Sequence, residues 1–184
     1  MNKDFFSRDA VTVAKAMIGM EFRLHNTGGI IVETEAYRSD DPASHSFNGP
    51  TARNRAMFGP PAHLYVYRSY GIHWCANIVC LSGSAVLIRA LDPQTGLDLM
   101  ALRRGTAATK ALCSGPGKLC QALGITGNLD GVSVLQEPFL LRDRQSVADV
   151  LVGARNGISK ATEAQWRFGL KGSDCLSKPF KRLR

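Results

Sequence analysis

The chain has 184 residues, with 23 Lys or Arg against 15 Asp or Glu, which gives a formal net charge of +8 at pH 7. This length fits one domain, residues 1–184, with a single sizeable core. The positive surplus favours a polyanionic partner such as nucleic acid or an acidic membrane surface, although a basic protein without such a partner would have the same composition. Because no run of about 18 apolar residues occurs, we expect no membrane-spanning helix and no membrane partner.

The cysteines and the N-terminal residues indicate a reducing compartment. The first residues, MNKDFFSRDAV, lack the apolar stretch of a secretory signal. The five cysteines are odd in number, widely scattered and without a C-x-x-C pair. Reduced thiols in a cytoplasmic protein fit this pattern better than a disulfide framework does.

The first third of the chain predicts a helix followed by two strands. Apolar residues recur at helical spacing between Val11 and Ile18, and either Ser7 or Asp9 can cap that helix. Residues 20–24 alternate as a short strand. Residues 26–29 (Asn-Thr-Gly-Gly) indicate a turn before the next strand, residues 30–37.

The strand at residues 30–37 carries two acids and a tyrosine. Side chains alternate between the two faces of a strand, so Ile31, Glu33, Glu35 and Tyr37 are expected on one face. Residues 32, 34 and 36 fall on the other face. Acids on a strand with an apolar side indicate the rim of a sheet, where water and ligand can reach them.

A long polar connection and a group of strands follow. Residues 38–62 are rich in Pro, Gly, Asn and Arg, and loops of that length are usually functional or disordered. Strands are then predicted at residues 64–67, 72–80 and 85–91. Tyr70 and Gly71 mark a tight reversal, which places Tyr70 at the tip of a hairpin.

Two helices followed by two shorter strands are predicted in the second half of the chain. Pro93 is expected to end its strand, and helices are predicted at residues 96–103 and, after Gly115-Pro116, up to Leu123. The small and basic residues 104–114 indicate a mobile surface segment. The remaining predictions are strands at residues 132–135 and 147–154 and a basic tail at residues 178–184. Because the strands cluster instead of alternating strictly with helices, the expected class is α+β.

Several motifs in order resemble a known family. They are VETEAY (residues 32–37), His45, RNRAMF (53–58), LYVYRSYG (64–71) and CSGPGKLCQAL (113–123). Together they resemble the alkyladenine DNA glycosylases, the 3-methyladenine DNA glycosylases of mammals and many bacteria, over residues 9–172. The resemblance implies one α+β domain with a curved antiparallel sheet, surrounding helices and a protruding β-hairpin. It also implies cleavage of the N-glycosidic bond of damaged purines in double-stranded DNA, by a monomer with no obligate protein partner and without metal or cofactor.

The resemblance assigns the chemistry to two residues. Glu35 matches the general base that deprotonates the attacking water, and Arg89 matches the arginine that helps to hold that water. Glu33, on the same strand face, is the rival, and it ranks lower because the family uses the second Glu of the ETE motif. No Lys stands beside Glu35 in the sequence, which predicts a monofunctional enzyme without strand cleavage.

The resemblance also predicts a pocket for the damaged base. Without the resemblance, the aromatic residues of that pocket would be interpreted as ordinary core residues. Aromatic rings stack well on electron-poor alkylated purines, which gives selectivity without reading base edges. The pocket predicted from the resemblance, with Asn77 crowding the exocyclic amino group of guanine, comprises Tyr37, His45, Tyr67, Asn77, Ala85, Leu87 and Ile158. Ala85 replaces a bulkier residue common in relatives, so the range of damaged bases is open.

The remaining candidates would contact the duplex. Tyr70 at the hairpin tip is the candidate wedge for the space that the flipped base leaves. Basic side chains expected to face phosphates, each equally readable as a solvated surface charge, are Arg53, Arg55, Arg68, Lys118 and Arg155.

Three other functions fit parts of the sequence. A carbohydrate hydrolase would pair Glu33 with Glu35 or Asp40 with Asp41, but acids two residues apart on one strand do not flank a bond from both sides. A metal-dependent nuclease needs a ligand cluster, and the four histidines have no ligand-like spacing. A noncatalytic nucleic-acid-binding module would keep the basic surface but lack the activity. An excision assay distinguishes such a module from a glycosylase.

Overall fold

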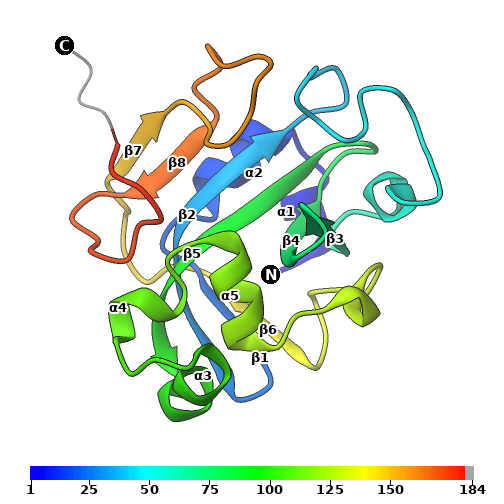
Figure 1. Ribbon diagram of the computed structural model, residues 1–184. Helices are drawn as coiled ribbons and strands as arrows, with labels where there is room; N and C mark the ends of the chain where they lie inside the picture. The colour runs from blue at the N-terminus through cyan, green and yellow to red at the C-terminus, as the bar shows by residue number, and fades with distance from the viewer. Residues whose placement is uncertain (181–184) are drawn as a thin grey trace.

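The eight strands of the described residues 1–180 form one antiparallel sheet in the computed structural model (Figure 1). The sheet curls into a half-barrel with helices around it, which confirms the predicted α+β class. Its main path runs β3-β4-β5-β2-β1-β6, and β8 pairs with both β2 and β7. The strands are β1 (Glu21–Leu24), β2 (Thr27–Tyr37), β3 (Leu64–Ser69), β4 (His73–Val79), β5 (Ala85–Thr95), β6 (Phe139–Arg142), β7 (Val150–Gly153) and β8 (Arg167–Leu170).

The N-terminal helices cover part of this sheet. The predicted helix is α2 (Ala10–Ala16), and Asp9 caps it by accepting hydrogen bonds from the amides of Val11 and Thr12, both at 3.1 Å. The Thr34 hydroxyl donates to the carbonyl of Ala14 at 2.9 Å and fixes α2 against β2. A four-residue helix before it, α1 (Lys3–Phe6), was not expected.

The turn between β1 and β2 is one residue earlier and shorter than predicted. It consists of residues 25 and 26, and strand pairing already begins at Thr27. Gly28 and Gly29 therefore lie inside β2, where a Cβ on Gly29 would stand 2.0 Å from the carbonyl oxygen of Asp92. These glycines allow close approach of two backbones and do not form the turn.

Two irregularities lie in the β2–β5 pairing. Pro93 does not end β5, which continues to Thr95, because Pro93 faces Gly29 at a register shift where a missing N–H is tolerated. A second pair of shifts passes over Val32 on β2 and Arg89 on β5. The strict alternation expected for β2 is therefore wrong at its middle: Ile31 joins the main core and Val32 packs in a separate cluster with Ala90. Bulges of this kind re-aim side chains beside functional sites.

The hairpin of β3 and β4 protrudes as predicted. Tyr70 occupies its tip with a positive φ of 51° and is 87 % exposed, and Ile72 is 65 % exposed. Figure 1 shows the loop of residues 38–62, in cyan, beside this hairpin. The loop contains one short 3₁₀ helix, Arg55–Phe58.

The central part of the chain adds three helices. The predicted helices are α3 (Leu97–Arg104) and α5 (Pro116–Leu123), the latter with Pro at its start. Residues 104–111 lie at the surface, as expected, and are exposed or partly exposed. The segment also contains α4 (Thr109–Leu112), and Leu112 and Cys113 at its end are buried in the main core, which was not expected.

The C-terminal strands were the least predictable. Residues 132–135 form no strand and contribute only an isolated bridge between Ser133 and His63, whereas β7 lies within the predicted residues 147–154. The sequence did not indicate β6 or β8. None of the described helices is long and apolar enough to cross a membrane. The end of the predicted basic tail, residues 181–184, lies outside the described residues.

Candidate active site

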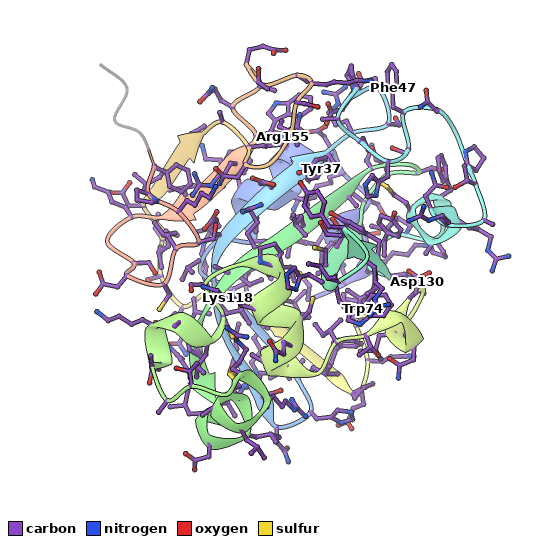
Figure 2. All side chains as sticks on the ribbon, viewed as in Figure 1. Tyr37, Phe47, Trp74, Lys118, Asp130 and Arg155 are labelled. Atoms are coloured by element: carbon purple, nitrogen blue, oxygen red, sulfur yellow. The ribbon has the colours of Figure 1, made fainter. Side chains whose placement is uncertain are left out.

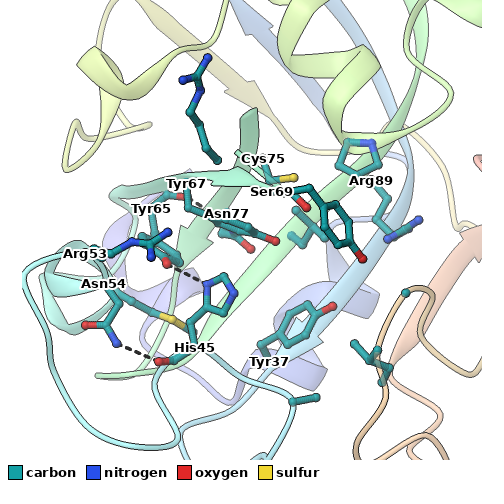
Figure 3. A pocket seen from close by; sticks show the side chains of 18 of the residues that line it. Tyr37, His45, Arg53, Asn54, Tyr65, Tyr67, Ser69, Cys75, Asn77 and Arg89 are labelled. Carbon is teal, nitrogen blue, oxygen red and sulfur yellow. Dashed lines mark hydrogen bonds between the residues drawn. The ribbon is translucent and has the colours of Figure 1, made fainter. Parts of the chain in front are cut away.

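A cavity of about 940 Å³ opens between the 38–62 loop, the β3–β4 hairpin, β5 and the segment around Gly157 (Figure 3). Most of the residues predicted for catalysis, base binding and DNA contact line it. They are Tyr37, His45, Arg53, Arg68, Tyr67, Tyr70, Asn77, Leu87, Arg89 and Ile158.

Glu35 lies directly behind the cavity wall. Its carboxylate has no exposed surface and accepts three hydrogen bonds: from Arg89 Nη1 at 3.1 Å, from the Tyr37 hydroxyl at 2.9 Å and from the amide of Asn156 at 2.7 Å. All three donor residues line the cavity. Burial raises the pKa of Glu35 above its ordinary value, and the Arg89 charge, the Asn156 amide and the Tyr37 hydroxyl partly offset that rise.

Glu33 has a different environment although it is only two residues away. Its buried carboxylate accepts from Arg89 Nε at 3.0 Å, from Arg167 Nε at 2.7 Å and from both the hydroxyl (2.7 Å) and the amide (2.5 Å) of Ser177. Four donors match the number of hydrogen bonds that a carboxylate can accept. Both arginines that contact Glu33, Arg89 and Arg167, are buried beside it.

Three rings form one wall of the cavity. The His45 and Tyr67 rings meet edge to face with centroids 4.4 Å apart, and Tyr65 stacks on Tyr67 at 5.5 Å. The Tyr65 hydroxyl lies 2.9 Å from His45 Nδ1 and orients that ring. Burial raises the pKa of Tyr65 to about 12 and, with the nearby Arg53 charge, lowers that of His45, so both rings are neutral near pH 7.

Two asparagines fix the backbone around these rings. Asn54 Nδ2 donates to the carbonyl of His45 at 2.8 Å and to that of Gly49 at 3.1 Å, which closes the loop over the cavity (Figure 3). Asn77 Nδ2 donates to the carbonyl of Tyr65 at 3.0 Å, across the β3–β4 pairing. The Asn77 side chain is therefore held rigidly at the cavity wall.

Ala85 lies beneath the pocket and does not line it. It shares the strand face of Leu87, as alternation predicts, but packs in a small core cluster with Met57, Tyr65 and Val79. Leu87 lines the cavity, whereas Ala85 is fully buried in that cluster. Its prediction as a pocket-floor residue is corrected accordingly.

Arg155 has a structural role, contrary to the phosphate contact expected from the sequence. Its fully buried guanidinium forms an ion pair with Asp41, and Nη1 donates to the carbonyl of Ala36 at 3.0 Å. It also lies over the rings of Tyr37 (4.7 Å) and Trp166 (5.0 Å), beside Tyr37 in Figure 2. A guanidinium without exposed surface does not reach DNA, but this one supports the Tyr37 ring.

The other basic candidates are exposed. Arg53 and Arg68 line the cavity, and the Arg68 guanidinium lies 5.0 Å from the Trp74 ring. Arg55 and Lys118 are exposed but do not line it. Their contacts with phosphates stay predictions.

The sequence did not single out several residues of this region. Tyr65 carried a usable signal, because it alternates with Tyr67 on the same strand face. Asn156, Arg167 and Ser177 carried none, because they come from unpredicted strands or loops more than 100 positions from Glu35. Lys178, which lines the cavity, appeared only as part of the basic tail.

In the described part of the chain, no group of three or more His, Cys, Asp or Glu side chains is arranged to hold a metal ion. The five cysteines are free and buried.

Comparison with known proteins shows similarity to DNA glycosylases over nearly the whole chain. The family model described as methylpurine-DNA glycosylase matches residues 4–174. A protein of Agrobacterium fabrum named "Putative 3-methyladenine DNA glycosylase" is 64 % identical over 97 % of this chain and 93 % of its own length. Relatives with the same name from Rhizobium meliloti and Nitrosospira multiformis are 56 % and 54 % identical, each over 96 % of this chain and over 96 % and 93 % of their own lengths. With its buried Glu35 behind a cavity of aromatic rings, the chain belongs to the methylpurine-DNA glycosylase family.

Proposed function

We propose that this protein flips damaged purines out of duplex DNA and hydrolyses their N-glycosidic bond with a water activated by Glu35. The main support for this proposal is the environment of Glu35. Its carboxylate is buried, accepts hydrogen bonds from three cavity-lining residues and has a raised pKa. The names of the relatives give 3-methyladenine, and the family resemblance extends the proposed substrate class to 7-methylguanine, hypoxanthine and ethenoadenine.

Glu35 is suited to a base that works near neutral pH. Three donors leave its carboxylate able to accept one further hydrogen bond, from a water at the cavity wall. A raised pKa makes the carboxylate a stronger base than an exposed one, and its negative charge offsets the oxocarbenium character that develops at C1′. Arg89, bonded to both glutamates, keeps Glu35 from withdrawing from the wall.

The ring wall supplies the selectivity. Tyr67 and His45 on one side and Tyr37 on the other offer electron-rich faces to a base that has left the stack. Because the rings and the fixed Asn77 amide are neutral, a cationic alkylated purine gains more from stacking than an undamaged purine does.

We further propose that the reaction is monofunctional. The groups that touch Glu35 in the described residues are a phenol, a guanidinium and a backbone amide, and none of them is a nucleophilic amine. In the proposed reaction water, and not the amine of Lys178 that lines the cavity, attacks C1′; the free base leaves, and an abasic sugar remains in an intact strand.

The test is single-turnover excision from duplexes that each hold one lesion. Glu35→Gln keeps the size of the side chain but removes the base, so release should fall roughly 10²–10⁴-fold while lesion binding persists. The matched control is Asp40→Asn, an exposed acid on the same segment. A Glu35→Gln rate near that of the wild type would move the role of base to another group, and a wild type inactive on every lesion would favour a noncatalytic module. A loss of wild-type excision in the presence of a chelator would instead favour the metal-dependent nuclease considered above.

A further inference from the structure

The C-terminal segment reaches the catalytic carboxylates through one hydroxyl group. The Ser177 hydroxyl donates to Glu33 Oε1 at 2.7 Å and accepts from Arg89 Nη2 at 3.2 Å. The Arg89 guanidinium thereby has a partner for each of its three nitrogens: Glu33 for Nε, Glu35 for Nη1 and Ser177 for Nη2. Ser177 is thus the neutral contact that completes the orientation of Arg89.

The segment that carries Ser177 is firmly anchored. Arg167 on β8 donates to the carbonyls of Lys178 and Pro179, and its guanidinium lies 3.9 Å from the centre of the Phe180 ring. That ring covers bare backbone of β7 and β8, where a Cβ on Gly169 would stand 2.4 Å from it. The position of Ser177 is therefore set by the contacts of the three residues that follow it.

A hydroxyl suits this place because it donates and accepts at once. Glu33 and Arg89 are both buried, so a partner that only donated would leave Arg89 Nη2 unpaired, and a partner that only accepted would face the Glu33 carboxylate. A charged side chain would upset the balance of two acids and two arginines, Glu33 and Glu35 against Arg89 and Arg167. A small alcohol is the group that fits.

We propose that Ser177 is a positioning residue for the reaction, which through Arg89 holds the Glu35 carboxylate in line with the water that attacks the sugar. This inference rests on the proposed function and adds to it a role for the C-terminal segment. Loss of the hydroxyl frees one end of the guanidinium, and displacement of a catalytic group by about 1 Å can cost up to 10²-fold in rate.

The proposal has a consequence for pH. The charged groups that face Glu35 are Arg89 from β5, Glu33 from β2 and, opposite it in the pairing, Arg167 from β8, with the hydroxyl of Tyr37 and the thiol of Cys75 nearby. Arg89 is the strongest influence that lowers the pKa of Glu35. If Arg89 moves away, the pKa of Glu35 rises further, so the fall in activity on the acidic side moves to higher pH.

The experiment compares single-turnover excision by four variants with the wild type across pH. Ser177→Ala should lower the maximal rate about tenfold, move the acidic limb to higher pH and leave lesion affinity within twofold. Ser177→Thr should keep most of the rate. Ser177→Val, whose side chain has nearly the same shape as threonine but no hydroxyl, should lose rate as Ser177→Ala does. Ser173→Ala is the control, because its hydroxyl accepts from the amide of Cys175 and contacts neither Glu33 nor Arg89.

Each outcome decides the proposal. A Ser177→Ala enzyme with the rate and pH profile of Ser173→Ala overturns it. If Ser177→Ala fails to fold, the Thr and Val variants decide, and equal rates for those two overturn the proposal. A wild type that excises no lesion overturns the proposed function itself, which distinguishes the two failures.

Discussion

At the scale of single residues, the environments of Glu33 and Glu35 explain how two neighbouring acids can do different work. Glu33 is held by four donors and neutralised by two arginines, whereas Glu35 has one arginine and stands against the cavity wall. Desolvation dominates at Glu35 and raises its pKa. The sequence ranked these acids only through the family resemblance, because a strand pattern places both on the same face.

The raised pKa predicts a pH profile for excision. A general base works only when deprotonated, so the single-turnover rate should fall as pH drops through the pKa of Glu35, which lies above the 4.5 of a free glutamate. The measurement is the rate from pH 4.5 to 9 on one lesion duplex, with circular dichroism to exclude acid unfolding. A rate that stays flat down to the ordinary carboxyl range would contradict the assignment of Glu35 as the base.

The buried Arg155–Asp41 pair predicts a large effect on stability. Asp41→Asn leaves a buried guanidinium without its countercharge, and breaking such a pair typically costs about 3–5 kcal/mol. Asp40→Asn removes the neighbouring acid, whose pair with Arg38 is exposed, and should cost less than about 1 kcal/mol. Urea unfolding of the two variants measures the difference, and equal midpoints would show that the pair does not contribute as its burial indicates.

At the scale of elements, alternation of side chains predicted β2, β3, β4 and much of β5, and with them the site face. It failed where a bulge passes over Val32 and Arg89, because a register shift depends on the partner strand and not on the local pattern. Short strands β6 and β8 were missed for a related reason: four residues carry little periodicity, and their pairing with β1 and β2 is fixed by the tertiary fold. Arg167 and Ser177 could not be predicted as neighbours of the site for the same reason: the tertiary fold, and not the local sequence, brings them there.

The exposed Tyr70 at the tip of the hairpin leads to a prediction for lesion binding and excision. This ring is 87 % exposed, on a tip with a positive φ of 51°. Tyr70→Ala should weaken lesion-specific binding and slow excision in duplex DNA by a few kcal/mol, about the unstacking energy that a wedge offsets. A lesion in single-stranded DNA needs little help to leave, so excision there should hardly change. Ile72→Ala, next to the tip and also exposed, is the matched control, and equal losses on both DNA forms would remove Tyr70 from the wedge role.

At the scale of the whole molecule, the positive charge is useful only if it gathers near the cavity. Arg53, Arg68 and Lys178 line the opening, whereas Arg155 and Arg167 are buried in ion pairs and contribute nothing to a long-range field. Composition alone could not separate these two groups, because the net charge of +8 counts both equally. Because the buried arginines are paired with the equally buried Glu33, Glu35 and Asp41, the net charge of +8 is carried by other side chains, and only those can attract DNA.

The salt dependence of binding tests this localisation. If DNA lies across the opening, the affinity for undamaged duplex should fall steeply with salt, with a log–log slope of about −0.9 for each phosphate neutralised. Arg53→Ala should reduce the magnitude of that slope by about one unit, because its side chain is exposed at the cavity. Arg142→Ala is the control: it removes an exposed charge from β6, at the opposite end of the sheet from the hairpin. Fluorescence anisotropy between 50 and about 200 mM salt measures both slopes. A flat dependence would argue against a DNA substrate, and equal slopes for the two variants would place the duplex somewhere other than the cavity mouth.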